Sequence, residues 1–542
     1  MPSLLLPFVP RYLALTLALV LALLFAVLGL TMQGLGTAFG LLAAIALVFA
    51  MVGVHDLVQT RHAILRNYPI TAHLRFLLED IRPEMRQYFF EADTDGAPFA
   101  RDKRAIAYQR AKRDLDKRPF GTQYDVYQER YEWLLHSLAP VEVPKADLRV
   151  LIGPECAQPY SASVLNISAM SYGALSANAI RALNRGAQAG GFAHDTGEGG
   201  ISPYHREAGG DLIWEIGSGY FGCRTRDGQF DPAGFAAAAQ APQVKMVELK
   251  LSQGAKPGHG GVLPAAKVTA EIAAIRGIPM GQDCISPPRH SAFSTPIGLL
   301  EMIARMRELS GGKPAGFKLC IGHPWEFLAI CKAMVATGIT PDFIVVDGKE
   351  GGTGAAPLEF MDHVGMPLRD GLTFVHGALI GTGLRDRVRL GASGKIVSAF
   401  DMARAMALGA DWCNAARGFM FAVGCIQAQN CHTDRCPTGV ATQDPRRGRA
   451  IVVPDKAERV ANFHSATLRA LGELVGAAGL DHPGQLRPVH FRHRTKGDGA
   501  TDFAGLYPLP QPGQLLSDPA ALPRYAADWA RARADSFAPA GL

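Results

Sequence analysis

Short apolar runs alternate with helical stretches between about residues 160 and 420, and this alternation constrains the fold more than any other feature of the chain. Helical patterns such as residues 297–309 and 326–337 lie between the runs. The candidate strands are residues 165–167, 192–195, 244–251, 283–286, 316–321, 343–347, 387–390 and 411–415. Strands separated by helices predict βα units with parallel strands, and eight such units close most economically into a (β/α)8 barrel.

A doubly wound open sheet is the alternative that this alternation allows. Such a sheet carries Gly-x-Gly-x-x-Gly after its first strand, where a helix begins. The chain has no such segment after residues 165–167. Glycine-rich segments instead follow most of the candidate strands, which is where a barrel builds its active site. We therefore predict an α/β protein of 542 residues in which a (β/α)8 barrel forms the catalytic body.

The N-terminal part contains no charged residue from Tyr12 to Val54. Two apolar runs, about residues 12–30 and 37–54, flank a break that contains glycine and glutamine. Since a helix needs about 20 residues to cross a bilayer, the runs predict a hairpin of two transmembrane helices. A cleaved signal peptide is the rival, but its apolar core is shorter, ends in a small-residue cleavage site and is not followed directly by a second run.

Positive charges flank the hairpin only at its two ends. Arg11 precedes the first run, Arg61 and Arg66 follow the second, and the connecting turn carries no charge. The positive-inside rule then places both ends, and the catalytic body, on the cytoplasmic side of the cell membrane. Six cysteines are scattered among apolar neighbours: Cys156, Cys223, Cys284, Cys320, Cys331 and Cys413. Buried free thiols of this kind are typical of a reducing compartment, which agrees with that placement.

The chain divides by composition into a transmembrane hairpin (1–56), a charged helical linker (57–150), the catalytic body (151–445) and a C-terminal extension (446–542). The charges of the linker are typical of a solvated face. From Arg487 onwards the extension is rich in Pro, Gly and His, which predicts surface wrapping or partial disorder. The net charge of +6 is small for this length and no compact Lys/Arg block occurs, so nothing supports nucleic-acid binding.

Three cysteines, Cys425, Cys431 and Cys436, fall within 12 residues and are followed directly by Pro437. Thiolates this close can hold one inorganic centre without a long loop, and a proline after the last cysteine is familiar from iron–sulfur ligation. On the cysteines alone, a structural zinc ion with His432 as the fourth ligand, or inert thiols with no metal, are together an equal alternative.

The spacing Cys-x5-Cys-x4-Cys followed by Pro-Thr-Gly-Val-Ala-Thr-Gln resembles the cluster loop in the synthase domain of glutamate synthase. Six other segments occur in the order of that family: 168–176 (SAMSYGALS), 196–200 (TGEGG), 253–258 (QGAKPG), 285–288 (ISPP), 351–354 (GGTG) and 384–390 (LRDRVRL). The resemblance covers roughly residues 150–445. It implies a barrel that binds FMN, and an iron–sulfur cluster, 3Fe–4S in type, held by Cys425, Cys431 and Cys436.

A barrel commonly seats a phosphate on the loops after strands 7 and 8, where glycine lets backbone N–H groups approach closely. Those loops are residues 392–395 and 415–418. The resemblance places the FMN phosphate there and indicates Ser393, Gly394, Lys395, Arg417 and Gly418 as cofactor-binding residues. The chain departs from the Asp-Gly-Gly that is usual after strand 7, and its Lys395 either contacts the phosphate or points to solvent.

The flavin ring needs a cation or hydrogen-bond donor near N1 and O2, because hydride uptake places negative charge there. Lys318, at the end of a candidate strand, matches a family lysine suited to that role, and a lysine in an apolar run is unfavourable without a partner. The resemblance indicates further cofactor-binding residues: Ala169, Met170, Ser171, Gly352, Thr353 and Gly354.

The segment 253–258 presents an amide, a bare backbone and an ammonium after the third candidate strand. In the related family this loop binds the oxo-acid substrate, which makes Lys256 and Gln253 candidate catalytic residues. Glu198 is a third, as a polar wall or proton relay. The chain has His259 where an acidic residue is expected in the long glutamate synthases.

The resemblance implies FMN-dependent reductive amination of 2-oxoglutarate, or a similar oxo-acid, to L-glutamate, with electrons delivered through the cluster. The glutaminase cysteine that opens the full enzyme has no counterpart before Cys156, so we expect ammonia from solution or from a glutaminase partner. No NADPH fingerprint occurs, so we expect an external electron donor, a ferredoxin or a reductase subunit. The alternatives are a membrane-associated flavin dehydrogenase that oxidises an amino or hydroxy acid and reduces quinone, and a non-catalytic electron-transfer subunit.

Overall fold

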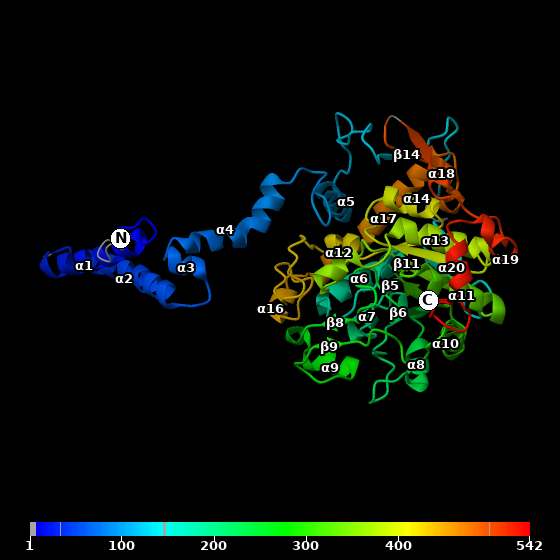
Figure 1. The fold of residues 1–542 in the computed structure, drawn as a ribbon, viewed down its shortest axis with the longest axis horizontal. Helices are drawn as coiled ribbons and strands as arrows, with labels where there is room; N and C mark the ends of the chain where they lie inside the picture. Colours follow the sequence, from blue (N-terminus) through cyan, green and yellow to red (C-terminus); the bar gives the residue numbers. More distant parts are fainter. Residues whose placement is uncertain (1–6, 33, 145–147, 498, 542) are drawn as a thin grey trace. The chain divides into compact units, whose positions relative to one another are not determined.

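The computed structural model describes residues 7–32, 34–144, 148–497 and 499–541 and divides into two compact units, Met1–Pro98 and Phe99–Leu542. Figure 1 shows the elements of both units. The smaller unit consists of helices α1 (Leu13–Thr31), α2 (Gly36–Val58), α3 (Ala63–Asn67) and α4 (Ala72–Met85), and the π-helix η2 (Arg86–Phe90). The first six residues of the predicted hairpin lie outside the described residues.

Helices α1 and α2 coincide with the two apolar runs and pack against each other. They are 19 and 23 residues long, with mean hydropathies of 2.9 and 2.4 in their most apolar stretches. Both are therefore long and apolar enough to cross a membrane. Most of their side chains are exposed, which distinguishes them from the buried core helices of a water-soluble protein.

The larger unit contains a closed barrel of eight parallel strands, as predicted. Its strands, in order around the barrel, are β4 (Leu165–Ile167), β5 (His194–Asp195), β6 (Leu212–Ile216), β7 (Val244–Lys250), β10 (Ala315–Leu319), β11 (Phe343–Asp347), β12 (Arg389–Ser393) and β13 (Trp412–Ala415). Seven of the eight candidate runs overlap these strands.

One predicted barrel strand is wrong. The segment 283–286 forms β9 (Cys284–Ile285), which pairs in antiparallel fashion with β8 (Val262–Leu263) in a separate hairpin. The third barrel strand is instead β6, so the loop that begins at Gln253 follows the fourth strand and not the third. Ile285 is 66% exposed, as an edge hairpin allows and an inner barrel strand does not.

Two helices predicted from the sequence are α10 (Pro296–Leu309) and α11 (Pro324–Thr337). Thr295 caps α10 by accepting the Gly298 N–H, and proline occupies the first helical position, as is typical of helix starts. Other helices of the barrel are α6 (Ala177–Gly190), α7 (Pro203–Arg206), α8 (Pro232–Ala239), α9 (Ala270–Arg276), α12 (Leu358–His363), α13 (Leu368–Gly381), α14 (Ala399–Ala407) and α15 (Arg417–Ala422).

The interior of the barrel changes from apolar to charged along the strands. One apolar cluster includes Ile213 of β6 and Met246 of β7, together with side chains of the hairpin β2 (Arg149–Ile152) and β3 (Tyr160–Ser163). Side chains alternate along a strand, so residues two apart share a face. Glu215 of β6 and Glu248 of β7 therefore continue the same inward rows toward the carboxyl ends of the strands, where barrels carry their active sites.

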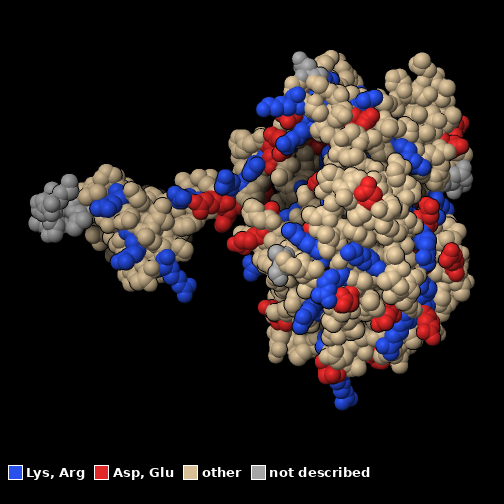
Figure 2. Space-filling model, turned by 45° about the vertical axis from the view of Figure 1, so that its right-hand side comes forward, with Lys and Arg blue, Asp and Glu red and all other residues tan. Residues whose placement is uncertain are grey.

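The segment after residue 445 packs on the barrel and is ordered where described. Helix α17 (Val453–Ala477) contacts α6 and α5 (Arg101–Lys112) and buries Phe463 and Leu471. The tail buries Phe491, Phe503, Leu515 and Tyr525. The remaining elements are α16 (Pro445–Gly448), α18 (Phe503–Leu506), α19 (Gln514–Ser517), α20 (Ala526–Arg531) and the sheet of β1 (Glu132–Leu134), β14 (Phe491–Arg494) and β15 (Ala500–Asp502). On the face drawn in Figure 2, acidic and basic side chains are interspersed over the larger unit.

Candidate active site

A cavity lies at the carboxyl ends of the barrel strands and encloses about 970 Å³ of space that is open to solvent. It brings together eleven residues predicted from the sequence: Ala169, Met170, Ser171, Glu198, Gln253, Lys256, Gly352, Thr353, Gly354, Arg417 and Cys431. They come from the segments that follow β4, β5, β7, β11 and β13. We call this space the main cavity.

Lys256 is almost completely buried in a tight turn, with 2% of its surface exposed. Burial lowers the pKa of its ammonium to about 8, because a charged group is poorly solvated there. The Glu198 carboxylate opposes this shift, and the Lys250 ammonium adds to it. Lys256 is thus a cation near neutral pH that loses its proton just above it.

Glu198 and Lys250 form an ion pair of 2.9 Å in the wall of the main cavity. Burial raises the pKa of Glu198, but the nearby cations Lys250, Arg276 and Lys256 outweigh it and hold that pKa below its ordinary value. Lys250 was not predicted from the sequence. It could have been found from strand alternation, because it lies two residues beyond Glu248 and so points to the same, inward side of β7.

Arg276 also lines the main cavity. It was not predicted from the sequence, because an arginine at the last residue of a helix, here α9, is ordinarily expected to be exposed. It is 5% exposed and donates to the Tyr172 carbonyl at 3.3 Å. Its Nε is buried and has no hydrogen-bond partner among the described atoms. A guanidinium held in this way is ready to receive an anionic ligand.

Lys267 completes the cationic lining. It is buried and donates to the Ala174 carbonyl at 2.7 Å and, more weakly, to the carbonyls of Cys431 and Ala441, both at 3.4 Å. The lining contains five cations, Lys250, Lys256, Lys267, Arg276 and Arg417, and two carboxylates, Glu198 and Glu215. This excess of positive charge suits a ligand with more than one carboxylate. His259 is not part of the lining, and its ring lies against Phe360.

A second, smaller cavity adjoins the first and shares Ala169, Gln253, Gly352, Ala416 and Arg417 with it. Its lining also includes the predicted residues Lys318, Ser393, Gly394 and Lys395, and the unpredicted Asn414, Asp347 and Glu350. Gly418 does not line it, and a side chain there would meet the ring of Phe463 at 3.1 Å. A side chain is therefore disfavoured at position 418, and the phosphate-binding role of its backbone stays a prediction. We call this space the second cavity.

The second cavity has the features that a flavin phosphate needs. Gly394 and Lys395 both have positive φ angles, 149° and 51°, so the backbone turns sharply at the end of β12. The Lys395 Nζ lies 5.6 Å from the centre of the Phe99 ring, and no ion pair is found for Lys395 among the described residues. Arg417 donates to the Thr353 carbonyl at 3.1 Å, which leaves its positive charge free for an anion. The residues present thus fit an FMN phosphate.

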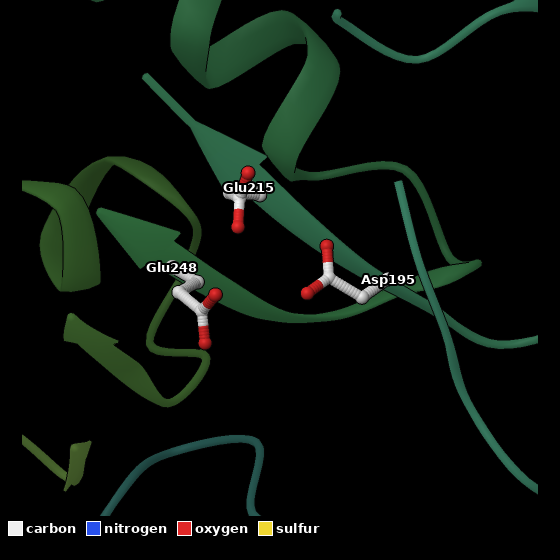
Figure 3. Close-up of side chains that lie close together, drawn as sticks. All are labelled: Asp195, Glu215 and Glu248. Atoms are coloured by element: carbon white, nitrogen blue, oxygen red, sulfur yellow. The ribbon is translucent and has the colours of Figure 1, made fainter. Parts of the chain in front are cut away.

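Lys318 is buried among carboxylates inside the barrel. Its ammonium bonds to Glu215 and lies 3.7 Å from Glu248. Asp195, Glu215 and Glu248, from β5, β6 and β7, point toward one another, and ligand atoms of the three lie within 4.8 Å of each other (Figure 3). The partner that a buried strand lysine requires is therefore a set of acids, none of which was predicted from the sequence.

This cluster shares protons because three carboxylates surround one ammonium. Burial and the Glu215 charge raise the pKa of Asp195 to about 7. Burial and the Asp195 charge likewise raise the pKa of Glu248, whereas burial lowers and the carboxylates raise the pKa of Lys318, with a net increase. Lys318 thus stays charged while part of the acid cluster is protonated near neutral pH.

The three cysteines Cys425, Cys431 and Cys436 line one small cavity. His432 does not line it but faces the main cavity, so the fourth ligand of the zinc alternative is not in place. Cys431 lines both cavities, which makes the cysteine cavity and the main cavity neighbours. The described residues that line this cavity include no histidine, carboxylate or fourth cysteine, and three cysteine sulfurs match the donor set of the expected cluster.

Backbone and side-chain donors support the cysteine loop. Burial raises the pKa of Cys436, but hydrogen bonds from Thr438, Ala441 and Val440 outweigh this and lower it. Residues assigned to the linker also hold the loop, which the sequence did not predict. The Tyr108 hydroxyl donates to the Cys425 carbonyl at 2.7 Å, and Phe99 exchanges two hydrogen bonds with the Gln427 side chain.

Comparisons with known proteins identify the family. A family model described as "Conserved region in glutamate synthase" matches residues 122–481. The chain is 38% identical over 502 residues to the glutamate synthase large subunit-like protein YerD of Bacillus subtilis, covering 85% of this chain and 95% of that protein. It is 35% identical over 377 residues to the archaeal glutamate synthase [NADPH] of Methanocaldococcus jannaschii, covering 69% of each chain.

A third relative is the archaeal-type glutamate synthase [NADPH] of Thermotoga neapolitana, 37% identical over 322 residues that cover 59% of this chain and 60% of that protein. The match to the first relative spans nearly its whole length, and the family model matches well over half of this chain. The chain therefore belongs to the glutamate synthase family and is an oxidoreductase of the glutamate synthase type.

Proposed function

We propose that this protein carries out FMN-dependent reductive amination of 2-oxoglutarate to L-glutamate, with electrons delivered through a 3Fe–4S cluster. One observation carries the proposal: the main cavity adjoins both the second cavity and the cysteine cavity. A substrate in the main cavity would have the proposed flavin site on one side and the proposed cluster site on the other. The bound groups would supply hydride and single-electron transfer.

The substrate is a dicarboxylic oxo-acid in this proposal, because the main cavity is lined by an excess of cations. Each carboxylate removed from water needs a cation or several N–H donors. Arg276, with its unpartnered Nε, and Lys256 are the two cations best placed to take one carboxylate each or to hold the reacting carbonyl. Lys250 is already paired with Glu198 and orients that carboxylate.

Glu198 and Lys256 are the proton-handling groups of the proposal. Both border the main cavity, and each shifts the pKa of the other. A lysine whose pKa is about 8 gives and takes a proton near working pH, which is the property of an efficient general acid or base. Ammonia, from solution or from a glutaminase partner, would add to the carbonyl carbon at this position.

The proposed cofactor residues remain those predicted from the sequence, Gly418 among them. Ser393, Gly394, Lys395 and Arg417 would hold the FMN phosphate, and Ala169, Met170, Ser171 and the segment 352–354 would line the ring. Lys318 would act near N1 and O2 of the flavin, and its carboxylate partners would set the potential there. Cys425, Cys431 and Cys436 would hold the cluster.

The proposed location is the cell membrane, with α1 and α2 as a spanning hairpin and the catalytic unit in the cytoplasm. Two relatives are named as NADPH enzymes, but this proposal assigns the chain an external electron donor, a ferredoxin or a reductase subunit. The length and hydropathy of the two helices support the anchor.

The proposal is tested by incubating the purified protein, loaded with FMN, with dithionite, 2-oxoglutarate and ammonium. We expect L-glutamate to form only when all three are present. If no glutamate forms but the flavin is reduced by an amino or hydroxy acid and reoxidised by a quinone, the reaction runs in the opposite direction and the synthase proposal is wrong.

A further inference from the structure

Helix α4 presents an apolar stripe on one face. Leu74, Leu77, Leu78, Ile81 and Met85 recur at spacings of three and four, which aligns them along one side of the helix. All five are exposed, from 37% for Met85 to 60% for Leu74. The aromatic side chains of η2 that follow are exposed as well: Tyr88, Phe89 and Phe90. A continuous exposed apolar surface of this kind marks an interaction site.

The opposite face of α4 is the one that packs within the smaller unit. Ala72 is buried, and Phe76, four residues on, lies with its ring 5.5 Å from that of His62. Because successive residues turn by about 100° around a helix, Ile81 points away from Ala72. The stripe is therefore not used by the contact that holds α4 to its own unit.

The start of α4 is bonded directly to the end of α2. Asp56 lies in the last turn of α2 and is fully buried. Its Oδ2 accepts the Ile70 N–H at 2.9 Å, and both carboxylate oxygens lie 3.0 Å from the His73 Nε2 in the first turn of α4. The first turn of α4 is thus fixed beside the last turn of a helix that is long and apolar enough to cross a membrane.

We propose that α4 and η2 lie in the plane of the membrane surface, with the apolar stripe inserted at the boundary between lipid headgroups and acyl chains. The argument rests on the proposed transmembrane hairpin. Where α2 leaves the hydrocarbon, the Asp56 contacts hold the beginning of α4 at the same level. A helix with one apolar and one charged face lies in that boundary, about 5–10 Å deep, and aromatic residues such as those of η2 are enriched there.

The charge of the helix defines the kind of lipid surface. The charged residues from 72 to 90 are three basic and three acidic ones: Arg75, Arg82 and Arg86 against Glu79, Asp80 and Glu84. Since the helix carries no net charge, burial of apolar side chains and not attraction to anionic lipids provides the binding. The occupant is therefore a lipid surface of ordinary zwitterionic composition.

A tryptophan scan tests this placement on the full chain. All five native tryptophans lie beyond residue 98, at 133, 214, 325, 412 and 529, so an indole placed in α4 can be followed by difference. Ile81→Trp places it in the stripe. Glu79→Trp is the matched control, because it lies two residues away on the charged side and disrupts only the exposed ion pair with Arg75.

Both variants are placed in phosphatidylcholine vesicles whose acyl chains carry bromine at different depths. We expect the indole of Ile81→Trp to have blue-shifted emission and to be quenched most by bromines close to the headgroups. The indole of Glu79→Trp should show neither effect. Addition of phosphatidylglycerol should leave both results unchanged.

Three outcomes would overturn the proposal. Blue-shifted emission from Ile81→Trp that bromine does not quench means that protein, either a second copy or another part of this chain, covers the stripe. Emission as in water means that the stripe faces solvent. Release of the unmodified chain by alkaline carbonate means that the hairpin itself is not inserted. If the chain resists carbonate and the indole is not quenched, only the placement of α4 fails.

Discussion

At the scale of single residues, the chemistry of the main cavity depends on how tightly its cations are held. Lys256 is buried beside another ammonium, and its pKa is lowered to about 8, chiefly by burial. A charge-assisted contact that forms with a transition state contributes about 3 kcal/mol, or roughly a hundredfold in rate. We expect Lys256→Met to keep the absorbance of flavin and cluster while flavin reoxidation by 2-oxoglutarate and ammonium falls by about that factor. Stopped-flow absorbance measures it.

The same residue predicts a pH dependence. If its ammonium is the active form, the rate is highest below the pKa and declines as the pH rises through about 8, where the proton is lost. The decline in rate above pH 8 should be absent in Lys256→Met. Lys256→Arg should restore little of the rate, because a planar guanidinium replaces a compact ammonium poorly. If Lys256→Met leaves the rate or the alkaline limb of the pH–rate profile unchanged, the cation that binds the substrate is another residue.

Lys318 and Glu215 form a second test at this scale. Removal of one partner of a buried ion pair costs about 3–5 kcal/mol, because the other charge is left uncompensated. We expect Lys318→Met to lower the free energy of unfolding by that amount, and Lys318→Met combined with Glu215→Gln to recover part of it. Urea denaturation measures both. If the double variant is no more stable than the single one, Lys318 is not stabilised chiefly by Glu215.

At the scale of elements, the sequence predicts the barrel but misses its third strand, β6. The run Leu212–Ile216 contains Glu215, and a carboxylate inside a short apolar run hides the signal of a buried strand. That carboxylate is paired there with Lys318 of β10, two strands along the barrel wall and 103 residues later in the chain. Periodicity reports local patterns, so a charge neutralised by a distant partner cannot be interpreted from it.

The residues that line the cavities also fall into two groups, those that a local sequence motif predicts and those that only the folded barrel brings together. Those in glycine-rich loops, such as Gln253 and Gly394, could be predicted because their segments resemble a family motif. Lys250 and Arg276 lie at the ends of β7 and α9, and only the closure of the barrel brings them to the main cavity. Tyr108 supports the cysteine loop from a helix that precedes it by more than three hundred residues, a contact with no local signal.

The loops after β7 and β11 are packed in direct contact, which predicts a selective effect of Gly254→Ala. A side chain at this position would clash with the Gly348 carbonyl oxygen, and the Gly254 N–H donates to Asp347 at 2.9 Å. Overpacking costs about 1–3 kcal/mol, so we expect a lower thermal midpoint. Gly354→Ala is the control, since no atom lies within 4 Å of the added carbon. Equal midpoints would show that the loops adjust freely.

The cysteine loop gives a prediction on cofactor content. We expect the isolated protein to show flavin bands with a broad shoulder from the cluster, and Cys431→Ser to lose the shoulder while it keeps the flavin. Cys431 is the cysteine that borders both cavities, so its loss opens the cluster site toward the main cavity. Metal analysis supplies the control. Stoichiometric zinc without iron would reject the cluster and restore the zinc alternative.

At the scale of the whole molecule, the chain divides into two compact units, and we expect the larger one to fold without the smaller. The buried core that surrounds the barrel is formed by residues from Phe99 onwards, so the larger unit has its own core. A barrel with its own core folds without an anchor. We therefore expect deletion of residues 1–98 to give a water-soluble protein that still binds FMN, as measured by absorbance after gel filtration.

A shorter deletion separates the contributions of the hairpin and of α4. Removal of residues 1–56 takes away both candidate spanning helices except for the last residues of α2, but leaves the apolar stripe of α4. We expect this protein to associate weakly and reversibly with phosphatidylcholine vesicles in sedimentation assays, and the protein without residues 1–98 not to associate at all. The difference arises because an interfacial helix binds through a few apolar side chains, whereas a spanning helix is inserted almost irreversibly. Loss of FMN from the protein without residues 1–98 would show that the smaller unit is part of the catalytic fold. Equal vesicle binding by the two truncated proteins would show that α4 does not contact the membrane.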